Sequence, residues 1–396
     1  MDKIRLFTKS RLASLLFGTL LLIMLTLISS QPIAAKQHQP DSTLIEARQI
    51  LPNDDLYRNP AIQQTFTQTV VQSGTGVDLP APTIKPLASM VALQGITHDW
   101  QLWNNCGPVT ITMNLSYFGR TETQLDSAPF LKPNQDDLNV SPHELVAYAQ
   151  TLGYKASVQV GGDLMLLKTL LSNDFPIIVE TWLDPSDYGG YGHYRLFTGY
   201  NEAEGHFIAH DSLNGFDIVV PFAEFDAFWQ VFNRTYVVVY PQEKSDVITA
   251  ILGSQQDDRI MLKLALRTAQ DEVIADLDNA YAWFNMGTNY ARLGMPHSSA
   301  YAFDKAQEIG LPYRMLWYQF DIFETYLALE RYEDVINIAT RQLRATGGLE
   351  EFYYYRGQAR LALGQRDLAI RDFQAAVNYN QNYRLPIEAL ESLDGT

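Results

Sequence analysis

The spacing of hydrophobic residues changes twice along this chain of 396 residues and divides it into regions. The first folded region opens with three segments of helical spacing, 107–119, 141–153 and 162–174. Pro108 and Pro142 fall in first turns, where a missing N–H costs no helical hydrogen bond, and Ser141 is a suitable cap. Four runs rich in β-branched and aromatic residues follow, 175–183, 192–200, 206–212 and 235–241. Helices followed by strands predict an α+β domain with an antiparallel sheet.

Helical spacing returns from about residue 246 and repeats to the end of the sequence. Segments 280–307 and 350–377 align at an offset of 70 residues, which is twice a period of about 35. The alignment brings five pairs into frame: Trp283 with Tyr353, Gly287 with Gly357, Gly294 with Gly364, Phe303 with Phe373 and Ala306 with Ala376. Residues 316–343 fit as a middle copy, with Phe323 where the other copies have a glycine. The pattern resembles the tetratricopeptide repeat and predicts an all-α solenoid over 246–396.

The N-terminus predicts a targeting segment over residues 1–35. Basic residues precede the apolar run 12–30, and the small residues Ala34 and Ala35 follow it. The run suits a cleaved signal peptide, and it is also long enough for a membrane anchor, which needs about 20 apolar residues. Both interpretations stay open. Because the positive charges precede the run, we expect the rest of the chain outside the cytoplasm, secreted or held at the cell envelope.

Residues 36–89 are expected to form a polar segment and a linker, since Gly and Pro concentrate in 73–86. Their position before the α+β domain, expected over 90–245, raises the hypothesis of an inhibitory pro-region. Hydrophobic residues make up 46% of the chain and aromatic residues 12%, which is typical of packed domains. The formal net charge of −16 argues against a general binder of nucleic acid or anionic membranes.

Cys106 is the only cysteine, so it cannot form a disulfide within the chain. Most free cysteines are buried and act as small hydrophobic residues. However, Cys106 directly precedes Gly-Pro at a predicted helix start, where the helix dipole favours a thiolate. The sequence around Cys106 therefore also suits a nucleophile.

A nucleophilic thiol needs a base, and the predicted hairpin 192–212 offers one. If Tyr200 pairs with His206, then His193 and Asp211 are diagonal neighbours on one face, whereas His206 and His210 face away. A slip of one residue would separate His193 from Asp211. His206 and His210 would lie about 13 Å apart on a strand, and the acidic clusters lack calcium-loop spacing, so no metal or cofactor is expected.

These residues predict nucleophilic catalysis. Cys106 would attack a carbonyl as a thiolate, His193 would transfer the proton, and Asp211 would orient the imidazole. The backbone N–H of Cys106 and the amide of Gln101 would stabilise the oxyanion.

Three segments, "QLWNNCGPVT", "GHYRLFTGY" and "HDSLNG", resemble motifs of the bacteriocin-leader-processing cysteine peptidases and their free-standing relatives in the papain-like clan. The order Gln, Cys, His, Asp is that family's. The resemblance covers about 150 residues and implies the same roles for Gln101, Cys106, His193 and Asp211. Leader-processing members are joined to transporter and ATPase domains, and this sequence shows no phosphate-binding Gly-rich loop. Cleavage after a double glycine is therefore not carried over.

Together these features predict an extracytoplasmic cysteine peptidase that hydrolyses peptide bonds. Its substrate would be a peptide or protein, and its repeats would recruit a protein partner or present the substrate. A packing role for the repeats is the simpler alternative. Two other functions stay open: a non-catalytic peptide-binding or protein-binding scaffold, and a thiol-dependent acyl-transferase or amidase with the same site.

Overall fold

The computed structural model describes residues 88–134, 136–183 and 189–394. The predicted targeting segment 1–35 and residues 36–87 of the predicted linker region lie outside these residues. Within the described part of the chain, no helix has the length and apolar character needed to cross a membrane.

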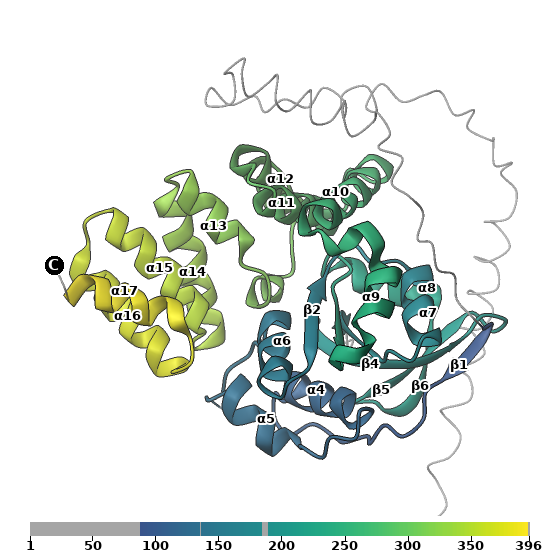
Figure 1. The fold of residues 1–396 in the computed structure, drawn as a ribbon. Coiled ribbons are helices and arrows are strands. Elements are labelled where there is room, and N and C mark those ends of the chain that lie inside the picture. The colour runs from purple at the N-terminus through teal and green to yellow at the C-terminus, as the bar shows by residue number, and fades with distance from the viewer. Residues whose placement is uncertain (1–87, 135, 184–188, 395–396) are drawn as a thin grey trace, which may run out of the picture. The chain divides into compact units, whose positions relative to one another are not determined.

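The N-terminal region is built on one antiparallel sheet of seven strands, ordered β2-β7-β3-β4-β5-β6, with β1 paired to β4 (Figure 1). The strands are β1 (Met90–Ala92), β2 (Lys155–Gln159), β3 (Ile177–Leu183), β4 (Tyr191–Asn201), β5 (His206–Asp211), β6 (Gly215–Pro221) and β7 (Tyr236–Tyr240). The four predicted strand runs correspond to β3, β4, β5 and β7. The antiparallel sheet confirms the α+β prediction.

Helices cover both faces of this sheet. They are α4 (Cys106–Ser116), α5 (Gln124–Leu131), α6 (Pro142–Thr151), α7 (Leu164–Ser172), α8 (Phe222–Gln230) and α9 (Ser245–Leu252). Along β3, Ile178 packs in the core with α4 and α6, whereas Ile177 and Val179 pack in the core with α7, α8 and α9. Since successive side chains of a strand point to opposite faces, one apolar run supplies both cores. Cys106 begins a helix of the first layer.

The strands β1, β2 and β6 and the helices α5 and α8 of this region were not predicted. The edge strand β6 has several exposed positions, and β2 at the other edge is largely polar, so neither forms a continuous apolar run. In addition, β2 lies between α6 and α7, and α8 lies between β6 and β7. The prediction that all helices precede all strands is therefore wrong in detail. The edge strands β2 and β6 were missed because a strand at the edge of a sheet can remain partly exposed.

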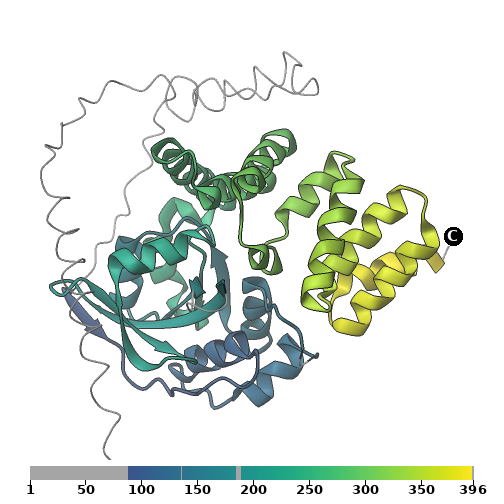
Figure 2. The ribbon, with the colours of Figure 1, turned by 180° about the vertical axis from the view of Figure 1, so that it is seen from behind.

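The C-terminal region is all helical from α10 onward (Figures 1 and 2). Its α-helices are α10 (Asp258–Ala275), α11 (Ala280–Arg292), α12 (Pro296–Ile309), α13 (Asp321–Ala328), α14 (Tyr332–Thr346), α15 (Glu350–Ala362), α16 (Arg366–Tyr379) and α17 (Arg384–Asp394). Short 3-10 segments connect some of them, including η4 (Tyr313–Trp317). We call residues 258–394 the repeat region.

Two glycines that align in the sequence occupy equivalent close contacts between paired helices. A Cβ atom on Gly287 of α11 would lie 2.7 Å from Phe303 of α12, and one on Gly357 of α15 would lie 2.6 Å from Phe373 of α16. In the middle copy Phe323 is buried and stacks on Tyr355 at 5.2 Å. The paired helices agree with the predicted resemblance to tetratricopeptide repeats, and the middle copy uses an aromatic contact instead.

Replacing Gly357 by alanine should destabilise the repeat region. The new methyl group would overlap Phe373, and overpacking costs about 1–3 kcal/mol, which outweighs a gain of roughly 1 kcal/mol in helix propensity. Urea unfolding of the full chain, followed by circular dichroism, measures the difference. The exposed Gln374 on α16 provides the control, because Gln374→Ala should change the free energy of unfolding by less than about 0.5 kcal/mol. Equal effects of both variants would contradict the packing role of this glycine.

Candidate active site

Cys106 is the first residue of α4, with Pro108 in the first turn. Its side chain is half-buried. Asn105 caps the helix without a side-chain hydrogen bond to the backbone, and its amide instead donates to Gln124 Oε1 at 3.1 Å. The sulfur therefore lies at the positive end of a helix of 11 residues, as predicted.

The hairpin of β4 and β5 does not have the predicted register at its turn. Tyr200 pairs with Phe207, one residue away from the predicted partner His206. An irregularity between Phe197 and Gly199 then shifts the pairing by one residue, so that Leu196 lies opposite His210 as predicted. A β-bulge inserts one residue into a strand and so compensates the error. The predicted proximity of His193 and Asp211 is correct only because of this bulge.

His193 and Asp211 are both buried and hydrogen-bonded to each other. The distance from His193 Nε2 to Asp211 Oδ1 is 2.9 Å. The Cys106 thiol is also hydrogen-bonded to His193. Because Nε2 of the ring is hydrogen-bonded to Asp211, Nδ1 is the ring nitrogen available to the thiol. The three side chains thus form a continuous chain from sulfur to carboxylate.

Asp211 is held by several further donors. Arg195 Nε donates to Oδ2 at 3.0 Å, the backbone N–H of Leu213 donates to Oδ1 at 2.8 Å, and Asn214 donates through its backbone and its side chain. The sequence gave no indication of the turn residues Leu213 and Asn214 as donors. These bonds fix the carboxylate beneath the imidazole.

The electrostatics favour a charged pair of thiolate and imidazolium. Burial raises the pKa of Cys106. The hydrogen bond and charge of His193 lower it, as do backbone hydrogen bonds from Tyr194 and Gly107. Together these lowering effects are larger than the effect of burial, so the net pKa of Cys106 is below its ordinary value. Burial lowers the pKa of His193, whereas its hydrogen bonds to Asp211 and Cys106 raise it to about 9. Burial raises the pKa of Asp211, but the hydrogen bond and charge of His193, together with hydrogen bonds from Asn214 and Leu213, have a larger opposite effect, so the net pKa is strongly lowered.

Gln101 lines the same pocket as Cys106 and His193. Its Oε1 accepts a hydrogen bond from the Ser212 hydroxyl at 2.9 Å, and its backbone N–H donates to the Ser212 carbonyl at 3.0 Å. Because the hydroxyl occupies the carbonyl end of the amide, the Nε2 end remains as a hydrogen-bond donor. The loop before α4 is thereby fastened to the end of β5.

The pocket has a volume of about 670 Å³ and is lined mainly by apolar and aromatic side chains. Arg314, Trp317 and Tyr318, which belong to the repeat region, form part of its wall. Arg314 Nη1 donates to the Gly190 carbonyl at 3.2 Å. These residues were not predicted from the sequence, and neither was Glu180 of β3, which also lines the pocket. The only signal in the sequence was the aromatic start of the irregular middle repeat.

The other strand histidines do not line this pocket. His210 accepts a hydrogen bond from the backbone N–H of Asp217 at 3.2 Å, and His206 lies 3.7 Å from Glu204. His98, in the loop before α4, lies 3.1 Å from the Asp211 carbonyl through Nε2. Among the described residues no group of three or more His, Cys, Asp or Glu could hold a metal ion.

Comparison with known proteins agrees with the motifs around Cys106, His193 and Asp211. Residues 91–237 match the model of the Peptidase_C39 like family. We call this part the C39-like domain. The match covers β1 through the start of β7, so it includes all four residues of the predicted site, and it confirms the predicted resemblance.

Three peptidases are among the solved structures that align with the chain. A putative C39-like peptidase from Bacillus anthracis is 18% identical, with 39% of this chain and 98% of that chain covered and a TM-score of 0.33. The peptidase domain of Streptococcus ComA, a bi-functional ABC transporter, is 17% identical, with 38% and 100% covered and a TM-score of 0.31. A double glycine motif protease from an AMS/PCAT transporter, in complex with the leader peptide, is 18% identical, with 40% and 100% covered and a TM-score of 0.30. The search of curated proteins gave no match.

Proposed function

We propose that the C39-like domain hydrolyses peptide bonds with Cys106 as nucleophile, His193 as general base and acid, and Asp211 as the group that orients the imidazole. The observation that carries this proposal is the hydrogen-bonded chain from the Cys106 thiol through His193 to Asp211. The match to a family of peptidase-like domains supports the same chemistry. A buried thiol with only a packing role would not require a charged imidazole beside it.

The reaction follows from this arrangement. The Cys106 thiolate attacks the carbonyl carbon of the scissile bond, and the oxyanion accepts hydrogen bonds from Gln101 Nε2 and the Cys106 N–H. The His193 imidazolium gives its proton to the leaving amine as the C–N bond breaks, which leaves a thioester. Neutral His193 then takes a proton from water, and the hydroxide attacks the thioester. The acid product leaves, and Cys106 returns to the thiolate.

Cleavage of a carboxymethylated casein, followed by mass spectrometry of the new termini, tests the proposal. Wild type should produce defined fragments, and prior alkylation of Cys106 should abolish them. A peptide that spans a cleaved bond, made with an internal quencher, then serves for kinetics. Intact casein after incubation with unmodified enzyme, together with unhydrolysed peptide pools, would argue against a peptidase and leave the scaffold hypothesis.

Gln101→Ala should lower kcat by about 10²–10³-fold with little change in KM, because one oxyanion donor is lost only in the transition state. Ser212→Ala is the matched control, since the Ser212 hydroxyl only orients the Gln101 amide at 2.9 Å. We expect a smaller loss for Ser212→Ala. If both variants retain wild-type kcat, then Gln101 is not an oxyanion donor.

We also propose that the protein acts outside the cytoplasm, with residues 1–35 as a signal peptide or as an anchor through the apolar run 12–30. The support is the order of basic residues, apolar run and small residues. N-terminal sequencing of the mature protein from a cell-envelope fraction distinguishes the two cases, because a cleaved chain begins near Ala35 and an anchored chain retains residue 1. Recovery of the full chain in the cytosolic fraction would contradict both.

A further inference from the structure

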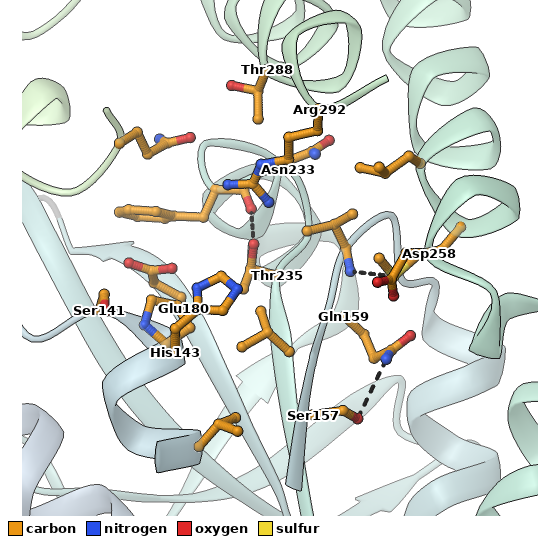
Figure 3. A pocket seen from close by; sticks show the side chains of 18 of the residues that line it. Ser141, His143, Ser157, Gln159, Glu180, Asn233, Thr235, Asp258, Thr288 and Arg292 are labelled. Carbon is orange, nitrogen blue, oxygen red and sulfur yellow. Dashed lines mark hydrogen bonds between the residues drawn. The ribbon is translucent and has the colours of Figure 1, made fainter. Parts of the chain in front are cut away.

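A second cavity lies beside the catalytic pocket, with a volume of about 780 Å³. Its walls come from both regions of the chain: Ser157 and Gln159 of β2 on one side, and Thr288 and Arg292 of α11 on another (Figure 3). Binding sites in proteins often have this size and often lie between domains. Nothing in the proposed chemistry of Cys106 uses this space.

The two cavities adjoin at Glu180 and Tyr318, because both residues line both cavities. Tyr318 comes from the repeat region and packs against Gly192, the residue before His193. A Cβ atom on Gly192 would lie 3.0 Å from the Tyr318 ring. The repeat region thus reaches the strand that carries the catalytic histidine, and Glu180 and Tyr318 lie at the boundary that the two cavities share.

Polar side chains in the second cavity lack partners. Gln159 is 4% exposed and its Oε1 accepts no hydrogen bond, and Thr288 is 2% exposed and its Oγ1 makes none. The Nε2 of Gln159 is occupied, because it donates to Ser157 Oγ at 3.3 Å. Buried polar groups are nearly always satisfied in folded proteins, so an acceptor and a hydroxyl left open on opposing walls point to a polar ligand.

Glu180 adds a third polar group where the cavities meet. It is 6% exposed, and it faces the space between His143 and Asn233 in Figure 3. Burial and the charge of Cys106 raise its pKa well above the ordinary value, against the opposing effect of Arg292. The carboxyl oxygens of Glu180 can accept hydrogen bonds from the N–H groups of a peptide. The charge of Arg292 is already balanced by Asp321, which its Nε contacts at 3.0 Å.

We propose that the second cavity binds an extended segment of the peptide substrate that continues from the catalytic pocket, so that the repeat region forms one wall of the substrate-binding site. This inference rests on the proposed peptidase function. Each residue of an extended peptide presents an N–H and a C=O that need partners. Gln159, Glu180 and Thr288 supply such partners along the cavity. The repeats then select substrates directly, beside any separate partner that they recruit.

The test measures peptide binding by the full chain with Cys106→Ala, which binds without cleaving. The probe is a degenerate library of acetylated ten-residue peptides, and mass spectrometry identifies the peptides that are retained. A fluorescent copy of a retained peptide then gives the Kd by anisotropy. We expect retention, and we expect shortening of that peptide to four residues to weaken binding at least tenfold, because it no longer spans both cavities.

Two variants test the cavity itself. Ser157→Phe adds a ring to the wall at β2 and should raise the Kd at least tenfold, and Thr288→Val removes one hydroxyl and should raise it about threefold. Lys155→Phe is the matched control on the same strand, because Lys155 is exposed and does not line the cavity. Melting temperatures verify that each variant is folded.

The outcomes separate this inference from the proposed function. No retained peptide, or an unchanged Kd in both cavity variants, overturns the inference. If wild type cleaves the retained peptide and Ser157→Phe cleaves it equally well, the inference fails and the peptidase function stands. If the peptide binds through the cavity but wild type does not cleave it, the inference holds and the peptidase function fails.

Discussion

Replacing Cys106 by alanine should abolish hydrolysis of an internally quenched peptide substrate, with a loss in kcat of about 10⁶-fold. The reason is that the sulfur is the only atom in the described pocket with both a lowered pKa and a hydrogen-bonded base. Without it, neither His193 nor Gln101 can form the thioester, and what remains is the small effect of binding and oxyanion stabilisation.

The matched control for this variant is Ser116→Ala at the other end of α4. Ser116 Oγ donates to the Met113 carbonyl at 2.7 Å and has no contact with the pocket, so kcat should stay within about twofold of wild type. Residual activity of Cys106→Ala above about one-hundredth of wild type would show that another group is the nucleophile.

Asp211→Asn should lower kcat by about 10⁴-fold, as loss of the orienting carboxylate does in serine peptidase triads. Asp211 accepts from His193 Nε2 at 2.9 Å, which fixes the ring orientation and stabilises the imidazolium. An amide can rotate so that its NH₂ group faces Nε2, and it then favours the tautomer with the proton on Nδ1. The pKa of His193, raised to about 9 by Asp211 and Cys106, should fall, so the pH range of activity should also change.

The direction of that change follows from the charged form of His193. In the proposed mechanism the imidazolium donates the proton to the leaving amine, so wild-type kcat should decline as pH rises through about 9. In Asp211→Asn the decline should begin at a lower pH. A pH profile of kcat for both proteins measures this. Because Arg195 loses its carboxylate partner in the variant, urea unfolding must establish the folded fraction. An unchanged alkaline limit would contradict the role of Asp211.

The proximity of Cys106, His193 and Asp211 could be predicted because each is part of a local pattern. A cysteine at a helix start and a hairpin with a histidine and a carboxylate of the right parity can be read without knowledge of distant contacts. The predicted register of Tyr200 was nevertheless wrong by one residue, and the bulge near Thr198 restored the pairing further along. A bulge depends on how the strand twists in the sheet, so the sequence alone did not reveal it.

The contribution of the repeat region to the pocket could not be predicted. Tyr318 reaches Gly192 across a long sequence separation, and Thr288 lies opposite β2 for the same reason. Such contacts depend on how the two regions pack against each other, and this packing cannot be predicted from helical spacing or residue type. The edge strands β2 and β6 were missed because partly exposed strands need no continuous apolar run. The buried strands β3 and β7, by contrast, could be predicted because each has a continuous apolar run.

The central claim is that Cys106 and His193 form a reactive ion pair, and the rate of thiol alkylation tests it most directly. Iodoacetamide labelling of the single cysteine is measured from pH 4 to pH 9, in wild type and in His193→Ala. We expect fast labelling of wild type to persist well below the usual thiol pKa of about 8.5, and His193→Ala to lose it. Labelling that follows an ordinary thiol titration in both proteins, or that requires unfolding, would contradict the account and make Cys106 a packing residue.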